Sequence, residues 1–390
     1  MRRTLQLPKS PSLATEIQFG VELEFLAPPI SLSQASPASP ASPDVPSRDR
    51  IFHFFASALQ QSGLQAAFLL DRDSDGEQNE LRARAPKGSI VRTKHNPDMY
   101  AMNPLSAAQW LRAGARENPL FRYWLVKAES DVCGHGKHAA WQPTELNSPI
   151  LRESEANNLF PGLNTALYAV WTAHPARAHV NDGCGLHVHV SPASAEGLTL
   201  LQAQRVATLV AVLENGLLFH LCSPVRRRVH HQLATASALA AAKAGPAAAA
   251  AAANLPPNIP VGGTMGKAMN LLWSASDLGQ VGQMLARHAK VRGARSTALH
   301  VKTHVREDDG VGSTLEFRHA QASFSHGFVD NWVRLVLTLC KVAFLPAERY
   351  KLVDSWKTLL KLLNDFAPAN WHGRSSEQYW VGYLAVQDRL

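Results

Sequence analysis

The stretch GVELEF, residues 20–25, places Glu22 and Glu24 between apolar residues. Strict alternation of polar and apolar residues indicates a half-buried strand. Residues two apart in a strand point to the same face, roughly 6.6 Å from each other. Two unpaired carboxylates about 7 Å apart repel each other by roughly 2–3 kcal/mol at an effective dielectric constant near 20. A bound cation would turn this cost into attraction, so the stretch predicts a strand and raises the question of what its two carboxylates bind.

Two later segments, CGLHVHVS and STLEFRHA, show the same alternation. The first places His187 and His189 on one face, and the second does the same with Glu316 and Arg318. A single polar pair is common on any solvent-facing strand, whereas three pairs of this chemical type indicate a site. Carboxylates with an occasional imidazole suit Mg²⁺ or Mn²⁺, and an arginine matches phosphate oxygens. If the strands share one sheet, the pairs predict a phosphate-bearing substrate, of which ATP is the commonest.

Composition narrows the class of protein. The chain has 390 residues, of which 46% are hydrophobic and 18% charged, which is typical of a soluble globular protein with a sizeable core. The net charge of +8 and the pI of about 9.4 favour anionic partners. Apart from residues 226–228 the sequence has no long basic run, so a nucleotide or an acidic metabolite explains the charge as well as a polynucleotide does.

The expected location is cytoplasmic. Four widely scattered cysteines favour a reducing compartment over a disulfide framework. The N-terminal segment lacks the apolar core of a signal peptide, and the apolar stretch 200–221 carries charged and amide side chains. We therefore expect an amphipathic helix there and no membrane span.

Strands and helices alternate along the chain without a glycine-rich nucleotide-binding fingerprint, which favours an α+β fold over a doubly wound sheet. The expected strands cover residues 16–26, 121–128, 143–151, 183–191, 297–304 and 313–320. The expected helices cover residues 51–63, 152–172, 194–222, 325–345, 348–364 and 376–388. We expect a flexible N-terminus over 1–15 and a single catalytic domain over 16–390, with low-complexity loops at 31–47 and 234–260.

The motifs FGVELEF, TELNSPIL, GCGLHVHVS and TLEFRHA, followed by VDNWVRLVLTL, resemble in this order those of the amidoligase family. These enzymes are ATP-dependent carboxylate–amine ligases related to glutamine synthetase and glutamate–cysteine ligase. The resemblance covers about residues 16–345, apart from the low-complexity loops. It implies a curved, mostly antiparallel sheet with the active site on its concave face and helices on its outer face.

The resemblance also implies roles for individual residues and for two divalent ions, Mg²⁺ or Mn²⁺, with Glu22 and Glu24 each binding one ion. The implied metal ligands are Glu22, Glu24, Glu145, His187 and Glu316. The residues implied to contact ATP are His189, Arg318 and either Arg227 or Arg228. Arg318 would hold the transferring phosphoryl group and forms, with Glu24, the implied catalytic pair.

The implied reaction joins a carboxylate to an amine through an acyl phosphate made with ATP. The partners are small-molecule or peptide carboxylates and amines, with neither nucleic acid nor membrane, and the sequence leaves the substrates and the oligomeric state open. Relatives commonly show an Asp-Ser pair where this chain has Glu129 and Ser130. Glutamate keeps the negative charge of aspartate but carries it on a longer side chain.

Two alternatives stay open. One is a metal-dependent hydrolase or oxygenase that uses His187 and His189. It lacks a further ligand at suitable spacing after His189, and it leaves Glu22, Glu24 and Arg318 without a role. The other is a catalytically inactive relative that binds a nucleotide, although no key residue is lost from the sequence.

Three further segments only imitate known sites. Residues 71–82 begin like a calcium loop but end on Arg82, where a glutamate is required. Residues 262–268 resemble a phosphate-binding loop with the wrong spacing, and we predict an ordinary loop there. Residues 133–138 hold a cysteine and two histidines too closely spaced for structural zinc, which again predicts a loop.

Overall fold

A computed structural model gives the three-dimensional structure of most of the chain. It describes residues 16–30, 47–69, 91–92, 100–102, 121–175, 177–194, 197–231, 233, 237, 239, 263–286, 296–304 and 312–345. The predicted flexible segment 1–15 and the two predicted helices after residue 345 lie outside the described residues. So do most of the two low-complexity segments, although Ser47 already begins a helix. The single-domain prediction therefore stays a prediction.

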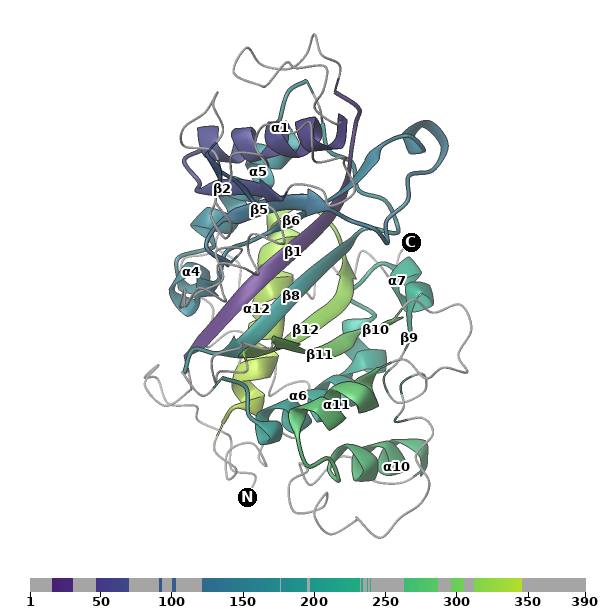
Figure 1. Ribbon diagram of the computed structural model, residues 1–390. Coiled ribbons are helices and arrows are strands. Elements are labelled where there is room, and N and C mark those ends of the chain that lie inside the picture. The colour runs from purple at the N-terminus through teal and green to yellow at the C-terminus, as the bar shows by residue number, and fades with distance from the viewer. Residues whose placement is uncertain are drawn as a thin grey trace.

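The fold is a mixed α+β structure built on one 10-stranded sheet (Figure 1). The strand order is β11-β12-β8-β1-β6-β5-β2-β4-β3, with β7 paired to β1. The sheet strands are β1 Ile17–Ala27, β2 Ala66–Leu69, β3 Val91–Arg92, β4 Tyr100–Met102, β5 Trp124–Ala128, β6 Gln142–Asn147, β7 Leu151–Arg152, β8 Gly185–Pro192, β11 Leu299–His304 and β12 Gly312–Gln321. All pairs from β11 to β5 are antiparallel, and β2 runs parallel to β5 and β4. This confirms the predicted α+β class and the mostly antiparallel sheet.

Helices pack against this sheet. The α-helices are α1 Ser47–Gln61, α4 Glu153–Asn157, α5 Pro161–Thr172, α6 Leu200–Leu213, α7 Pro224–Val229, α10 Gly263–Leu272, α11 Leu278–Leu285 and α12 His326–Ala343. Shorter elements are the 3₁₀ turn η4 Gly136–His138, the π-helical turn η5 Glu214–Leu218 and the small strand pair β9 His230–His231 and β10 Ser296–Thr297. α1 contacts β2, β5 and β6, α12 contacts β8, and α11 contacts β11. None of the described helices has the length and apolar character needed to cross a membrane.

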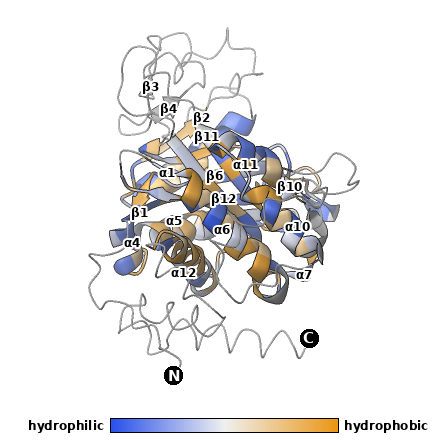
Figure 2. Ribbon diagram, turned by 90° about the horizontal axis from the view of Figure 1, so that it is seen from below, coloured by the Kyte–Doolittle hydropathy of each residue, from blue (hydrophilic) through white to orange (hydrophobic). Residues whose placement is uncertain are grey.

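The alternation in β1 produces the predicted two-faced strand. Ile17, Phe19, Val21 and Leu23 are buried in the core, and the Phe19 ring meets the Phe160 ring edge-on at 6.1 Å. Full burial of such a side chain contributes about 1.5–3 kcal/mol. Hydrophobic residues also run along most of α12, which lies behind the central strands (Figures 1 and 2). The core therefore fixes which face of β1 remains for polar side chains.

The predicted single helix over 152–172 is wrong, because the chain forms two helices, α4 and α5. Leu159 and Phe160 separate them with φ angles of 64° and 53°, in the left-handed region that interrupts a helix. Pro161 then begins α5, where its missing N–H costs nothing. The buried Phe160 ring fixes this break, since it fills the core beside Phe19. Tertiary packing thus overrides a continuous helical pattern.

Other boundaries also differ from the sequence predictions. The expected helix over 194–222 begins only at Leu200, because Thr199 and Gln202 form a capping box there. The predicted loop at 262–268 is wrong, since α10 covers most of it. Met269 and Leu272 of α10 are fully buried, which shows an apolar face that the glycines obscure. The strands β2, β3 and β4 and the helix α11 were not predicted.

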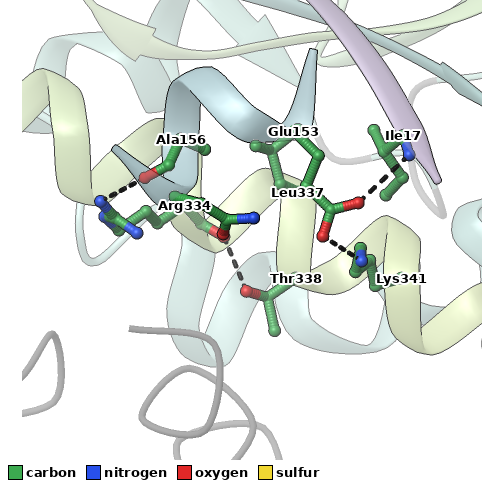
Figure 3. Close-up of a pocket in the computed structure, with 8 residues that line it drawn as sticks. Ile17, Glu153, Ala156, Arg334, Leu337, Thr338 and Lys341 are labelled. Carbon is green, nitrogen blue, oxygen red and sulfur yellow. Dashed lines mark hydrogen bonds and ion pairs between the residues drawn. The ribbon is translucent and has the colours of Figure 1, made fainter. Parts of the chain in front are cut away.

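A small pocket lies between α4, α12 and the first residue of β1 (Figure 3). Glu153 pairs there with Lys341 and accepts a hydrogen bond from the Ile17 backbone N–H at 3.4 Å. Arg334 donates to the Ala156 carbonyl at 2.7 Å. These contacts join the two helices to the sheet, and we interpret the pocket as structural.

One buried carboxyl predicts a pH-dependent stability. Burial raises the pKa of Asp330 to about 7, although a hydrogen bond from Asn164 and the charge of Arg334 each lower it. Between an unfolded value near 3.8 and this folded value, only the unfolded chain ionises, so rising pH destabilises the fold. We expect Asp330→Asn to raise the melting temperature at pH 7.5 and to lose this advantage towards pH 4. Thermal melts of both proteins at several pH values measure this effect. A difference in melting temperature that does not change with pH would contradict the explanation.

Candidate active site

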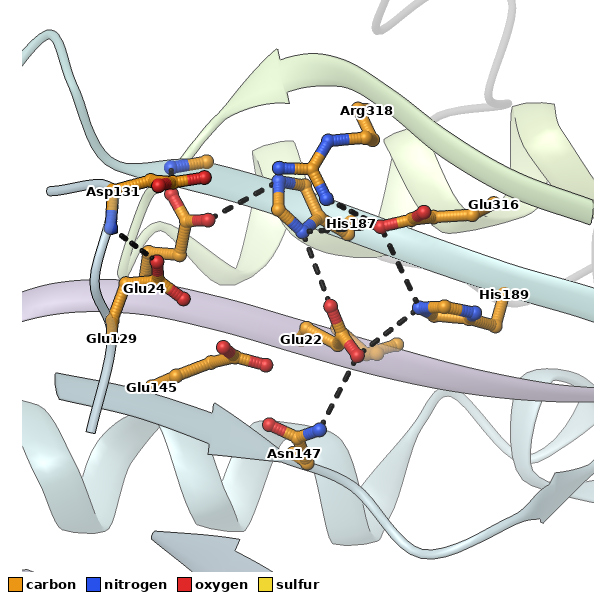
Figure 4. A network of polar contacts seen from close by, with 12 residues as sticks. Glu22, Glu24, Glu129, Asp131, Glu145, Asn147, His187, His189, Glu316 and Arg318 are labelled. Atoms are coloured by element: carbon orange, nitrogen blue, oxygen red, sulfur yellow. Dashed lines mark hydrogen bonds and ion pairs between the residues drawn. The ribbon is translucent and has the colours of Figure 1, made fainter. Parts of the chain in front are cut away.

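The predicted polar pairs meet on three neighbouring strands, β12, β8 and β1, in the middle of the sheet. The backbone register places Glu22 opposite His187, and His189 opposite Glu316. Because facing residues in adjacent strands point to the same side, their tips converge (Figure 4). The sequence pattern therefore predicted a cluster that the sheet assembles from residues up to 296 positions apart, as Glu22 and Arg318 are.

Glu22 is the centre of this cluster. One of its oxygens lies 3.1 Å from His189 Nε2 and accepts a hydrogen bond from Asn147 Nδ2 at 3.3 Å. The other oxygen lies 3.2 Å from His187 Nδ1. Burial alone raises the pKa of Glu22, but the charge of His189 and the hydrogen bonds from both histidines lower it overall. Glu22 is therefore an anion that both imidazoles face.

Glu22, His189 and Glu316 form a set of three ligands suited to a metal ion. Their ligand atoms all lie within 4.8 Å of one another, and no other group of this kind occurs among the described residues. His189 Nε2 is buried without a hydrogen bond of good geometry, although Glu22 is close. Two carboxylates with one imidazole match the preferences of Mn²⁺ and Mg²⁺. The residues present thus fit the divalent ion that the family resemblance implies.

Cations surround Glu316, whose side chain is almost fully buried. Arg318 Nη1 lies 2.5 Å from one carboxylate oxygen, and Lys302 Nζ and His300 Nδ1 lie 3.1 and 3.3 Å from the other. Burial alone raises the pKa of Glu316, but the hydrogen bond with His300 and the nearby positive charges lower it well below its usual range. Glu316 thus stays ionised beside Arg318, His300 and Lys302, whose side chains are partly exposed to solvent.

Glu24 is held by the start of β8. The Gly185 backbone N–H donates to Glu24 Oε2 at 2.6 Å, and His187 Nε2 lies 3.4 Å from Glu24 Oε1. Arg226 is buried beside them and donates to the Arg318 carbonyl at 2.8 Å. A Cβ at position 185 would lie 2.5 Å from His187 Nε2 and 3.0 Å from Arg226 Nη2. Only glycine allows these groups to approach so closely.

Glu145 on β6 lies opposite both Glu24 and Lys127. Lys127 Nζ is 3.1 Å from Glu145 Oε1. Burial raises the pKa of Glu145 well above its usual range, and the charge of Glu22 adds to this effect. Burial lowers the pKa of Lys127, but the charges of Glu145 and Glu22 raise it overall. At this end of the site, burial and nearby carboxylates oppose the charge of Glu145, and the Lys127 ammonium group favours it.

The structure brings together most of the residues singled out from the sequence. The members found on this one face are Glu22, Glu24, Glu145, His187, His189, Glu316 and Arg318. Arg227 and Arg228 belong to α7, but their side chains lie outside the described part of the chain, and their contact with phosphate stays a prediction. Glu129 lies beside the cluster and accepts a hydrogen bond from the Asp131 backbone N–H at 2.7 Å (Figure 4).

Sequence reasoning missed several contributors, namely Lys127, Asn147, Arg226, His300 and Lys302. Three of them, His300, Lys302 and Asn147, had a readable signal. LHVKTH alternates polar and apolar residues like its neighbours, and Asn147 follows Glu145 by two positions. Lys127 and Arg226 needed the strand order and the path of α7, which no local pattern gives.

The cysteine–histidine segment at 133–138 forms no metal site among the described residues. Its turn η4 ends on His138, whose ring stacks on that of His179 with 3.8 Å between centroids. Asn181, in the turn that precedes β8, donates to the Cys133 carbonyl at 2.8 Å.

The four cysteines predict a simple chemical test. Cys133 is exposed, whereas Cys184, Cys222 and Cys340 are buried. Burial raises the pKa of Cys184 to about 12, which suppresses the reactive thiolate. We expect one thiol per native chain to react rapidly with a disulfide reagent at pH 8, and four after denaturation. Rapid native labelling of Cys184, located by peptide mass spectrometry, would contradict the packing of β8.

Comparison with known proteins gives little further information. No protein-family model matches the chain, and no curated protein matches it. Among the solved structures that match is one described as a novel glutamine synthase homolog, with a TM-score of 0.37 and 14% sequence identity. The alignment covers 96% of this chain and 66% of that one, so this chain spans less than two thirds of that structure.

Proposed function

We propose that the protein is an ATP-dependent carboxylate–amine ligase of the amidoligase type, with its active site on the polar, concave face of the sheet. One observation carries the proposal. Glu22, His189 and Glu316 form a three-ligand cluster, and Arg318 lies directly beside it. A divalent cation site next to an arginine is what binding and transfer of a phosphoryl group require.

A divalent ion bound by this cluster would neutralise charge on the phosphate oxygens of ATP. His189 is part of the three-ligand group, whereas His187 lies between Glu22 and Glu24. We therefore propose His189 as the metal ligand and His187 as the residue that positions the two carboxylates. The family resemblance implies instead that His187 binds the metal and that His189 contacts ATP.

In the proposed reaction a substrate carboxylate attacks the γ-phosphate of ATP, which gives an acyl phosphate and ADP. Arg318 stabilises the negative charge of the transferring group, since its guanidinium fork matches phosphate oxygens. An amine then attacks the acyl carbon and releases phosphate. Lys302 and His300 contact Glu316 and therefore lie at the same site. Their basic groups suit the remaining phosphates of the nucleotide.

The hydrolase or oxygenase alternative receives less support. Both nitrogens of the His187 ring lie within 3.4 Å of glutamate oxygens, and only His189 belongs to the three-ligand group. A site built on both histidines would also leave the buried Arg226 and the nearby Arg318 unexplained. An inactive nucleotide-binding relative would keep the cluster but release no ADP.

The test is a screen of acid and amine pools with the full-length protein, ATP and Mg²⁺, in which ADP formation is measured. We expect ADP release that requires both an acid and an amine, and its loss in Arg318→Ala. ADP release that ignores the amine, or turnover of test substrates without ATP, would contradict the proposal. Binding of Mg²⁺–ATP without any ADP formation across the pools would favour the inactive relative.

A further inference from the structure

Lys127 is fixed in the site by the sheet itself. It lies on β5 with its Cα opposite that of Glu145 on β6, and Glu145 in turn lies opposite Glu24 on β1. Lys127 Nζ is 3.1 Å from Glu145 Oε1, and Glu145 is almost fully buried. Because backbone pairing sets these positions, the ammonium group points at the carboxylate row.

Glu24 and Glu145 have few free positions for a metal ion. Glu24 Oε2 accepts the short hydrogen bond from the Gly185 N–H at 2.6 Å, and Glu24 Oε1 lies 3.4 Å from His187 Nε2. Lys127 Nζ lies 3.1 Å from Glu145 Oε1, without a hydrogen bond of good geometry, and Glu129 is hydrogen-bonded to the Glu145 carboxyl group. Within the described part of the chain only Glu22, His189 and Glu316 offer three ligand atoms close enough to share an ion.

We propose that the Lys127 ammonium group takes the place of a second divalent cation, so that the site binds one divalent ion, at Glu22, His189 and Glu316. This inference rests on the proposed function and departs from the two-ion arrangement that the family resemblance implies. An ammonium group supplies positive charge and hydrogen bonds to the carboxylates, but it has no vacant coordination position. Lys127 is therefore a positioning residue that holds Glu145 and balances the charge of the row.

The test counts Mn²⁺ ions bound per full-length chain, by calorimetric titration and by electron paramagnetic resonance. We expect one ion for the natural protein and two for Lys127→Met, since removal of the ammonium frees Glu145 Oε1 for a metal ion. Lys127→Arg keeps the charge and should still bind one ion. Lys302→Met is the matched control, because Lys302 Nζ is also 3.1 Å from a site carboxylate, Glu316, and it should leave the number at one.

The outcomes separate the two proposals. Two ions in the natural protein, or a single ion in a folded Lys127→Met, would overturn the role of Lys127 and leave the ligase proposal standing. Absence of bound Mn²⁺ in the natural protein, or binding that Glu316→Gln does not weaken, would overturn the metal site and with it both proposals. Circular dichroism of each variant establishes that it is folded.

Discussion

Glu316→Gln is expected to lower acid- and amine-dependent ADP release by at least about a hundred- to a thousandfold, as loss of one group that stabilises transition-state charge typically does. The carboxylate is almost fully buried and belongs to the three-ligand group. Gln keeps the shape of Glu but cannot offer an anionic ligand, so Mn²⁺ binding should weaken in parallel. Steady-state ADP release and Mn²⁺ titration on the same preparation measure both effects.

Glu153→Gln is the matched control for this prediction. Glu153 is also a largely buried glutamate with a cationic partner, Lys341, but it lies in the pocket between α4 and α12 (Figure 3). We expect it to lower stability to a similar extent and to leave Mn²⁺ binding unchanged. Equal losses of binding in both variants would show that general stability, and not the cluster, explains the effect of Glu316→Gln.

Gly185→Ala is expected to damage the site through one methyl group. The added Cβ would lie 2.5 Å from His187 Nε2 and 3.1 Å from Glu24 Oε2, so both side chains must move. Overpacking of this kind costs about 1–3 kcal/mol, which corresponds to roughly a five- to 150-fold loss if it acts on Mn²⁺ affinity. Thermal unfolding and Mn²⁺ titration show how the cost divides between stability and binding.

Gly20→Ala tests the same change one strand away. A Cβ at Gly20 in β1 would meet Ser148 Oγ and His189 Cβ at 3.8 and 3.9 Å, which are ordinary contacts. We expect this variant to keep its stability and its Mn²⁺ affinity. If Gly185→Ala were equally harmless, the close approach of His187, Arg226 and Glu24 around position 185 would be wrong.

The central strands could be predicted because each has its own local signal. GVELEF, GLHVHVS and TLEFRHA alternate with a period of two, and the structure places them side by side as β1, β8 and β12. Their polar pairs therefore predicted that Glu22, His189 and Glu316 would lie on one face, although the family resemblance assigned the metal to His187 and not to His189. A strand that is polar on one face and apolar on the other has only one way to pack.

Other features depended on contacts that no local pattern contains. The break at Leu159 and Phe160 follows from the place that the Phe160 ring takes beside Phe19. Lys127 enters the site only because β5 pairs with β6 in a register that sets it opposite Glu145. In the first case a tertiary contact sets a helix boundary. In the second case strand pairing sets the charge balance of the site.

The most direct measurement is an anomalous difference map from crystals of the full-length protein grown with Mn²⁺ and a non-hydrolysable ATP analogue. We predict a strong peak in contact with Glu22, His189 and Glu316, with the analogue's phosphates between that peak and Arg318. A map with no peak at these three residues, or with the nucleotide bound on the helical side of the sheet, would contradict the proposed ligase site.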